Sequence, residues 1–127
     1  MSSALVWLSC LSLWHAAHEQ RRIVPPRLTL AVAWVESRCG ANARTSSAGA
    51  IGVMQIMPFW ARTNLAHKCG RSLRDAKTSV CYGTRILRHY LVRCRGNVNC
   101  ALARYSGRAE GYSLKVRRAM RAQKGWY

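Results

Sequence analysis

Acidic residues are scarce in this chain of 127 residues, which holds four Asp and Glu residues against 21 Lys and Arg residues. The imbalance gives a formal net charge of +17, which favours polyanionic partners such as nucleic acid, anionic lipid or anionic cell wall. A solvated cationic surface would have the same composition, so both interpretations stay open. Any reaction that needs a carboxylate must use one of four residues: Glu19, Glu36, Asp75 and Glu110.

Metal-binding and nucleic-acid-binding signatures are missing as well. The chain has no Cys-x2-Cys pair, and its His residues do not accompany the cysteines, so we expect no zinc site and no cofactor. Without a helix-turn-helix or RNA-binding signature, we expect no specific nucleic acid partner. No repeat, linker or low-complexity segment divides the chain, and half of its residues are hydrophobic. We therefore expect residues 1–127 to form a single domain.

Six cysteines in so short a chain favour an oxidising compartment and structural disulfides, with free buried thiols as the alternative. Cys10 and Cys39 lie at similar distances on either side of Pro25, so they would stand level in an antiparallel helix pair. Cys94 and Cys100 flank a predicted helix break and could close a short loop. The expected pairs are Cys10–Cys39, Cys69–Cys81 and Cys94–Cys100.

Helix start and stop signals, together with apolar residues at helical spacing, divide most of the chain into helices. Pro25 ends the first helix, and Pro26 suits the first turn of the next. Ser72, with Asp75 three residues on, resembles a helix-starting cap within a loop over residues 69–77. The sequence therefore predicts an all-α fold with helices over Ser3 to Arg22, Arg27 to Cys39, Met57 to Leu65, Ala76 to Cys94, Val98 to Tyr105 and Tyr112 to Ala122.

The first segment, Met1 to Trp14, is apolar and has no Lys or Arg. It is similar to the apolar region of an export signal but lacks a basic start and a clear small-x-small cleavage site. Residues 1–13 could overlap an export signal inside the first helix. A membrane-spanning helix is not expected, because His15, His18 and Glu19 interrupt the apolar run.

Glu36 is the acid whose surroundings point to chemistry. It follows the run Leu28 to Val35, in which only Thr29 is polar, so the pattern predicts a helix buried on all sides. Burial disfavours the charged carboxylate and should raise the pKa of Glu36, as a general acid requires. The positive field of the chain opposes that shift, although salt screens it. A structural ion pair between Glu36 and an Arg is the alternative.

The segment after Glu36 predicts a binding wall. A polar stretch, Gly40 to Gly49, can loop back over the acid. The apolar stretch Gly49 to Pro58 follows, and its glycines let a backbone approach a ligand closely. Gln55 is the only hydrogen-bonding side chain in this stretch. We expect the aromatic pair Phe59-Trp60 to lie in the core rather than to form a ligand platform.

Three motifs occur in order: Glu36-Ser37, then Gly-Ala-Ile-Gly-Val-Met-Gln-Ile-Met-Pro over residues 49–58, then Ala-Leu-Ala-Arg-Tyr-Ser-Gly over residues 101–107. Together they resemble the signature of soluble lytic transglycosylases, peptidoglycan-cleaving relatives of goose-type lysozyme. The third motif resembles the family's Ala-x-x-Tyr-Asn-x-Gly, with Ser106 where Asn is usual. The resemblance runs from about Leu11 to Tyr112. It implies a lysozyme-like helical domain with a loop or small hairpin between the catalytic helix and the Gly-Val-Met-Gln motif.

The resemblance also implies roles for individual residues. Glu36 would protonate the glycosidic oxygen between N-acetylmuramic acid and N-acetylglucosamine. It would then take the proton of the muramyl C6 hydroxyl as that group attacks the anomeric carbon. Tyr105 would lie beside the acid, and Tyr112 would line the groove or, more in keeping with its apolar ring, pack in the core. The residues implied to bind substrate are Ser37, Gly52, Val53, Met54, Gln55, Tyr105, Ser106 and Tyr112.

A single carboxylate that acts as acid and then base would leave a 1,6-anhydromuramic acid end. The first alternative is a lysozyme-type muramidase, which uses water and normally needs a second carboxylate. Glu19 has charged neighbours and fits a solvated surface, and Asp75 fits a helix start. Glu110, in a Gly-rich turn, is then the remaining candidate for a second acid.

A second alternative is a purely cationic protein that binds membranes or nucleic acid through its basic C-terminal segment. That segment contains Lys115, Arg117, Arg118, Arg121 and Lys124, followed by Trp126 and Tyr127. In an enzyme, the same helix could add contact with an anionic envelope surface. The resemblance implies a monomer that acts on peptidoglycan glycan strands in the periplasm or cell envelope, with secretion or a phage-associated role as alternatives.

Overall fold

The protein is all-α, as predicted. The computed structural model describes residues 3–123, with side chains from residue 10 onward. No strand occurs within these residues, so a loop rather than a hairpin lies between α2 and the Gly-Val-Met-Gln motif. One isolated bridge pairs Ile51 with Ile56, on either side of that motif. No helix among them has the length and apolar character needed to cross a bilayer. The elements are α1 (Ser3–Glu19), α2 (Pro26–Ser37), the 3₁₀ helix η1 (Pro58–Arg62), α3 (Leu65–Cys69), α4 (Ala76–Arg93), α5 (Val98–Tyr105) and α6 (Tyr112–Ala122).

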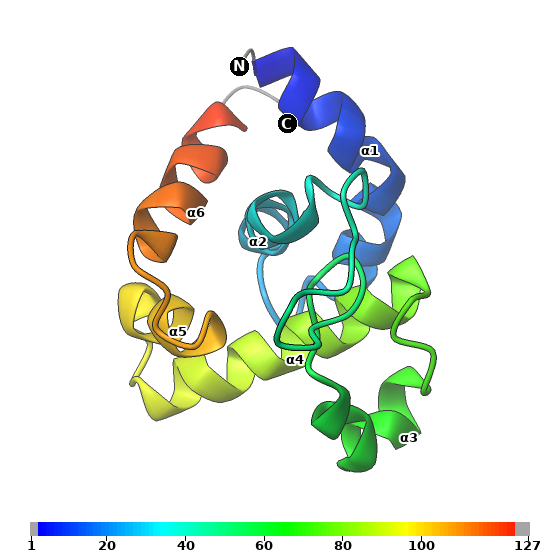
Figure 1. Ribbon diagram of the computed structural model, residues 1–127. Coiled ribbons are helices and arrows are strands. Elements are labelled where there is room, and N and C mark those ends of the chain that lie inside the picture. Colours follow the sequence, from blue (N-terminus) through cyan, green and yellow to red (C-terminus); the bar gives the residue numbers. More distant parts are fainter. Residues whose placement is uncertain (1–2, 124–127) are drawn as a thin grey trace.

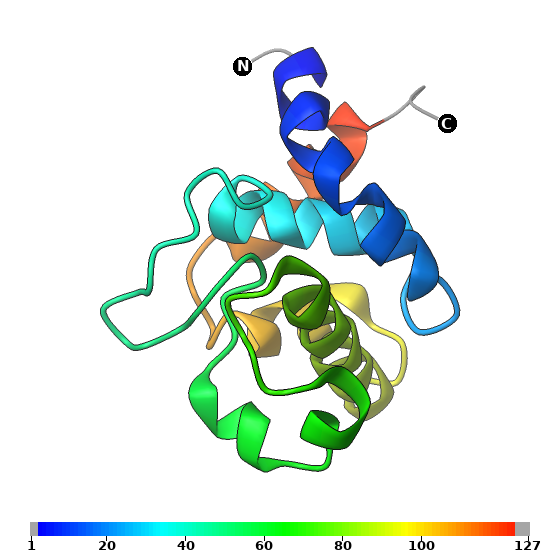
Figure 2. The same cartoon turned by 90° about the vertical axis from the view of Figure 1, so that its right-hand side faces the viewer.

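Helix α2 occupies the centre of the molecule. Figure 1 shows the other long helices around it, and Figure 2 shows α1, α2 and α6 above α4, α5 and α3. Every residue of α2 from Leu28 to Trp34 is buried, and none is more than 8% exposed. A helix that is apolar all round is stable only in such a position, because each Å² of apolar surface left in water would cost about 25 cal/mol. The predicted burial of this helix is confirmed.

Helix α1 ends earlier than predicted, at Glu19 instead of Arg22. Residues 20–23 form hydrogen-bonded turns that leave the helix axis before any proline is reached. Pro25 therefore does not end α1. It directly precedes α2, and Pro26 is the first residue of that helix, where a missing N–H costs nothing.

The single helix predicted over Met57 to Leu65 is instead two short elements. Thr63 has an extended backbone, with φ −98° and ψ 178°, which interrupts the helical hydrogen bonds after Arg62. Helix α3 then begins at Leu65 and runs to Cys69, into a segment predicted as loop. The sequence signals missed this break because no Gly or Pro lies next to Thr63 to mark it.

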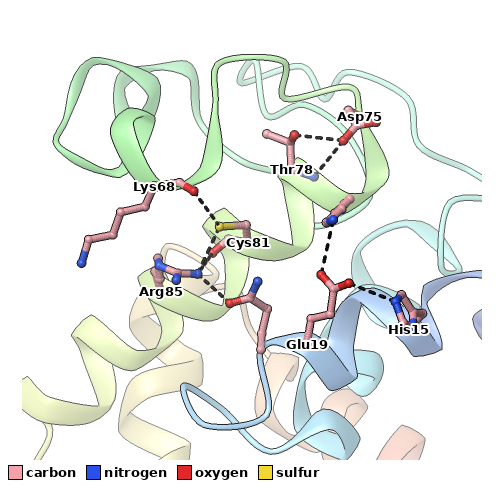
Figure 3. A network of polar contacts seen from close by, with 9 residues as sticks. His15, Glu19, Lys68, Asp75, Thr78, Cys81 and Arg85 are labelled. Carbon is pink, nitrogen blue, oxygen red and sulfur yellow. Dashed lines mark hydrogen bonds and ion pairs between the residues drawn. The ribbon is translucent and has the colours of Figure 1, made fainter.

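Helix α4 begins at Ala76 with Asp75 as its N-cap. The Asp75 carboxylate accepts hydrogen bonds from the Thr78 N–H at 3.0 Å and from the Thr78 hydroxyl at 2.9 Å, and these bonds lower the pKa of Asp75 (Figure 3). They satisfy a free donor of the first helical turn. The helix-start role of Asp75 is confirmed, but the cap is Asp75 itself rather than Ser72, because only Asp75 is adjacent to the first turn.

Figure 3 also shows the surface contact that joins α1 to α4. Glu19 lies 3.0 Å from His15 in its own helix, and its other oxygen lies 3.5 Å from Lys77 of α4. His15 and Lys77 are largely exposed and Glu19 is 36% exposed, so the contacts contribute little stability. The prediction that Glu19 belongs to the solvated surface is confirmed.

The three expected disulfides are present. Cys10–Cys39 joins α1 to the residues after α2, Cys69–Cys81 joins α3 to α4, and Cys94–Cys100 closes the turn between α4 and α5. Their Cα atoms lie 5.0, 5.5 and 5.8 Å apart, which suits a disulfide. All six cysteines are paired, so the alternative of free buried thiols is wrong.

Thr29, the polar residue inside the buried run of α2, has a side-chain hydroxyl with no hydrogen-bond partner in the described part of the chain. A buried hydroxyl without a partner costs about 1–3 kcal/mol. Thr29→Val removes that group and keeps the shape, so we expect the free energy of unfolding to rise by about 1 kcal/mol in urea denaturation. Ser79→Ala is the matched control: its hydroxyl accepts the Met54 N–H at 3.0 Å, so its loss should destabilise the protein instead. A loss of stability in Thr29→Val would show that the hydroxyl is satisfied in solution.

Candidate active site

Glu36 lies one residue before the end of α2, on the wall of a hollow of about 430 Å³. The loop after α2 folds back to this hollow, as predicted. The other walls come from the Gly-Val-Met-Gln segment, η1, α4 and the end of α5. The lining residues besides Glu36 are Ser46, Ala48, Ala50, Gln55, Met57, Phe59, Trp60, Tyr90, Arg104, Tyr105, Ser106 and Gly107.

Tyr112, the first residue of α6, holds the Glu36 carboxyl. Its hydroxyl donates a hydrogen bond to Glu36 Oε2 at 2.8 Å. Tyr112 is only 6% exposed, and burial together with the nearby Glu36 charge raises its pKa, so the phenol stays a donor. Of the two interpretations of Tyr112, packing in the core is the one that agrees with its burial. Its hydrogen bond to Glu36 was not predicted, because a sequence pattern indicates that a ring is buried but not which group its hydroxyl contacts.

Burial raises the pKa of Glu36 from an ordinary 4.5 to about 7, and the Tyr112 hydrogen bond opposes part of that shift. The direction agrees with the prediction. Desolvation disfavours the charged form of the half-buried carboxyl more than one donor favours it. Glu36 takes part in no ion pair within the described residues, so the alternative of a structural Arg–Glu36 pair is wrong. A carboxyl that is about half protonated near neutral pH can serve as both acid and base.

Tyr105, also on the wall of the hollow, fixes the Gly-Val-Met-Gln segment beside the acid. Its hydroxyl donates to the Met54 carbonyl at 2.8 Å, while the Met54 N–H donates to the Ser79 hydroxyl at 3.0 Å. Ser79 lies in α4, was not singled out from the sequence, and is fully buried. Both backbone groups of Met54 thus contact the protein, and its side chain is buried against Gly83 of α4.

Ser37, Gly52, Val53 and Met54 do not line the hollow, although the sequence placed them among substrate-binding residues. Ser37 is 2% exposed, and its hydroxyl donates to the Val53 carbonyl at 2.7 Å and accepts the Gly40 N–H at 2.9 Å. The Ser37–Val53 hydrogen bond joins the end of α2 to the motif loop. Because the Ser37, Val53 and Met54 side chains are buried, a sugar would have to meet the backbone of this loop, and the substrate-binding role of these four residues stays a prediction.

Gln55 does line the hollow, as expected for the polar residue of this wall. Its side-chain nitrogen donates to the Arg44 carbonyl at 2.9 Å and to the Gly52 carbonyl at 3.0 Å. Both amide hydrogens are therefore used by the protein. The remaining polar atom of the side chain is its carbonyl oxygen, which can accept a hydrogen bond from a sugar hydroxyl or N-acetyl N–H.

Glu36 is the only carboxylate among the described residues that line this hollow. Glu110 lies exposed in the turn between α5 and α6, and it is absent from the walls. No group of three or more His, Cys, Asp or Glu side chains in the described part of the chain could hold a metal ion. The geometry therefore offers one acid with a raised pKa, one phenol that orients it, and a groove bounded by aromatic and amide groups.

A family described as the transglycosylase SLT domain matches residues 12–125, nearly the whole chain. The chain belongs to this family. No curated protein and no solved structure shows a significant match. Membership implies a glycosidase-like enzyme that cleaves peptidoglycan glycans, and an enzyme with that substrate acts outside the cytoplasm.

This SLT domain has an aromatic pair on the wall of its groove. Phe59 and Trp60 of η1 both line the hollow, with ring centroids 4.8 Å apart. Phe59 is 46% exposed, so the expectation that this pair lies in the core is wrong for Phe59 and only partly right for Trp60, which packs against the core. No residue of the short 3₁₀ helix is buried, because η1 lies on the surface of the domain.

Ser106 also lines the groove of the SLT domain, at the position where the family usually has Asn. Its hydroxyl donates to the Ala103 carbonyl at 3.1 Å and accepts the Ala109 N–H at 3.2 Å. These bonds stabilise the turn after α5. A hydroxyl occupied in this way offers less reach toward a substrate than the longer Asn side chain would.

Proposed function

We propose that this SLT domain is a peptidoglycan lytic transglycosylase. It cleaves the β-1,4 bond between N-acetylmuramic acid and N-acetylglucosamine and leaves a 1,6-anhydromuramic acid end. The observation that supports this proposal is Glu36, a carboxyl with a pKa raised by burial to about 7, as the one described acid on the wall of the groove. Gln55, Tyr105 and the Phe59-Trp60 pair are the groove residues that we propose to contact the sugars.

In this mechanism Glu36 transfers its proton to the glycosidic oxygen as the bond to the anomeric carbon breaks. The C6 hydroxyl of the same muramyl residue then attacks that carbon, and its proton passes to Glu36, which restores the acid. Tyr112 donates to Oε2 throughout, so Oε1 carries the transferable proton. The attacking hydroxyl is already part of the substrate, which gives it a high effective concentration.

The competing function is hydrolysis by a lysozyme-type muramidase. A water-using mechanism needs either a base that activates water across the ring or a carboxylate nucleophile. Glu110 was the remaining candidate for that role, but it is exposed and does not line the groove. The transglycosylase reaction needs no second carboxylate and is therefore the better fit.

Product analysis distinguishes the two reactions. Purified sacculi digested in oxygen-18 water should release mainly 1,6-anhydro muropeptides, each lighter by one water than its reducing counterpart and free of the label. Mass spectrometry of the released muropeptides reads both features at once. Products dominated by labelled reducing ends would identify a hydrolase and refute the proposal.

The pH dependence of cleavage should follow Glu36. Its acid form donates the first proton, so kcat/KM should fall as pH rises above about 7, the pKa of Glu36. Tyr112→Phe removes the hydrogen bond that lowers this pKa, so the alkaline limb should move to higher pH. Tyr105→Phe is the matched control: its hydroxyl contacts Met54 rather than Glu36, so the limb should keep its position whatever the rate. Equal shifts in the two variants would contradict this role of Tyr112.

We further propose that the chain acts as a single-domain monomer in the cell envelope, with α6 as an accessory contact to anionic envelope material. Four exposed cations of α6 support this proposal: Lys115, Arg117, Arg118 and Arg121. The remaining basic and aromatic residues of that predicted segment, Lys124, Trp126 and Tyr127, lie outside the described residues.

A further inference from the structure

A second hollow, larger than the one at Glu36, lies between α2 and α6 and has a volume of about 580 Å³. It shares no lining residue with the groove at Glu36. Trp34, which lines it, is two residues from Glu36 and so points to the opposite side of α2. This hollow is therefore separate from the proposed reaction, and an inference about it does not depend on that reaction.

Three cationic residues line this hollow: Arg38, Lys115 and Arg118. No carboxylate is among the described residues that line it. The other described residues that line it have apolar side chains: Trp34, Val35, Ala119 and Ala122. A site whose described lining combines three cations with apolar side chains fits a small ligand that combines an anionic group with a carbon framework.

Arg38 is held in place by two contacts within the protein. Its guanidinium lies over the Trp34 ring, 4.9 Å from the centroid, and one of its nitrogens donates to the Trp34 carbonyl at 3.2 Å. A guanidinium positioned in this way loses little freedom when an anion binds. Its remaining N–H groups suit the paired oxygens of a phosphate or carboxylate.

The backbone of Arg38 makes glycine a suitable test replacement for this side chain. Arg38 ends α2 in the left-handed conformation, with φ 54° and ψ 43°. Glycine is the residue that usually occupies this position, because a side chain there costs about 1 kcal/mol. Arg95 and Arg108 share this left-handed conformation, so the backbone angle identifies a tolerated substitution and is not itself evidence of binding.

We propose that this hollow binds a phosphorylated sugar, with the phosphoryl group on Arg38, Lys115 and Arg118 and the sugar against the apolar wall. A phosphate monoester carries nearly two negative charges and so matches three cations better than a single carboxylate does. The volume is within the range of small-ligand sites. A lipid headgroup is a poorer match, because Leu114 is the only large, exposed apolar side chain of α6 among the described residues.

Isothermal titration calorimetry of the full chain with N-acetylglucosamine 1-phosphate tests this site. N-acetylglucosamine, inorganic phosphate and vesicles containing phosphatidylglycerol serve as the other titrants. The sugar phosphate should bind at least about tenfold more tightly than either half of it, since each half lacks one of the two kinds of contact. Inorganic phosphate that binds as tightly as the sugar phosphate would show an adventitious anion site only and overturn the proposal.

Arg38→Gly is the decisive variant. It removes one cation and also relieves the left-handed strain, so the fold should be as stable as before or more stable. We expect it to weaken sugar phosphate binding about tenfold, as should Arg118→Gln. Arg95→Gly is the matched control: Arg95 is an exposed arginine with the same φ of 54°, but it lies between α4 and α5 and does not line the hollow.

Binding by Arg95→Gly should stay within about twofold of the parent. An equal loss in Arg38→Gly and Arg95→Gly would assign binding to the general charge of the chain. A loss in Arg38→Gly confined to vesicle binding would assign the hollow to lipid headgroups. Either result would overturn the sugar phosphate site.

Discussion

Glu36→Gln should reduce the release of muropeptides from sacculi by about 10²–10⁴-fold, close to complete loss in a standard assay. Gln has the shape of the protonated acid and can accept the Tyr112 hydrogen bond, but it has no transferable proton. The exposed acid Glu110, which lies outside the groove, gives the matched control. Glu110→Gln should keep the parent rate, and the reverse pattern would move the catalytic role to Glu110.

The same substitution should stabilise the fold at alkaline pH, which separates lost chemistry from lost structure. The pKa of Glu36 is raised from 4.5 to about 7 by burial, so the folded state binds the proton more tightly than the unfolded state does. That contribution is fully present below about 4.5 and is lost as pH rises through about 7. Above this range Glu36→Gln should be more stable than the parent by roughly 1–3 kcal/mol, a figure reduced for the partial exposure of the carboxyl. A stability difference between Glu36→Gln and the parent that is the same at pH 5 and pH 8 would contradict a raised pKa of Glu36.

Gly52→Ala should displace the Gly-Val-Met-Gln segment, although Gly52 itself does not line the groove. A Cβ at Gly52 would lie 2.3 Å from the Leu73 carbonyl oxygen and 3.3 Å from the Ser79 hydroxyl. Its φ of +80° adds left-handed strain of about 1–2 kcal/mol. The clash is with backbone, which cannot move as a flexible side chain would, so a further 1–3 kcal/mol, roughly, is expected. We expect a total loss near 3 kcal/mol in chemical denaturation, together with loss of cleavage because the Gly-Val-Met-Gln segment shifts.

Gly49→Ala provides the control that separates strain from the clash. Gly49 has a φ of +96°, but a Cβ there would meet nothing within 4 Å. It should therefore cost only the strain of about 1 kcal/mol. Equal losses in the two variants would mean that the close approach of Leu73 to Gly52 does not exist in solution.

Much of the fold could be predicted from the sequence because its signals are local. The limits of α5 and α6 were correct to the residue, since breaks rich in Gly and Asn separate them from their neighbours. Helix α4 was correct to within one residue. The disulfide pairs also followed from the sequence, because a predicted antiparallel helix pair and a predicted short loop already bring their cysteines together.

The raised pKa of Glu36 belongs to the same class of predictions. An acid at the end of a run with one polar residue has to be desolvated once the helix is buried. The family resemblance rested on short contiguous motifs, and the match over residues 12–125 confirms it. Periodicity and motif spacing are properties of neighbouring residues, so the sequence by itself determined the fold class, the family and the partial burial of Glu36.

Only the tertiary structure decided which residues face the groove. Ser37 and Met54 lie in the right motifs but point inward, whereas Phe59, assigned to the core, is exposed at the edge of the groove. The direction of a side chain in a loop or 3₁₀ turn depends on backbone angles and distant packing, which no local period encodes. The Tyr112–Glu36 contact spans 76 residues of sequence, and the cationic hollow combines Arg38 with α6. Such contacts depend on how α6 packs across α2, and that packing is set by the whole core rather than by either segment.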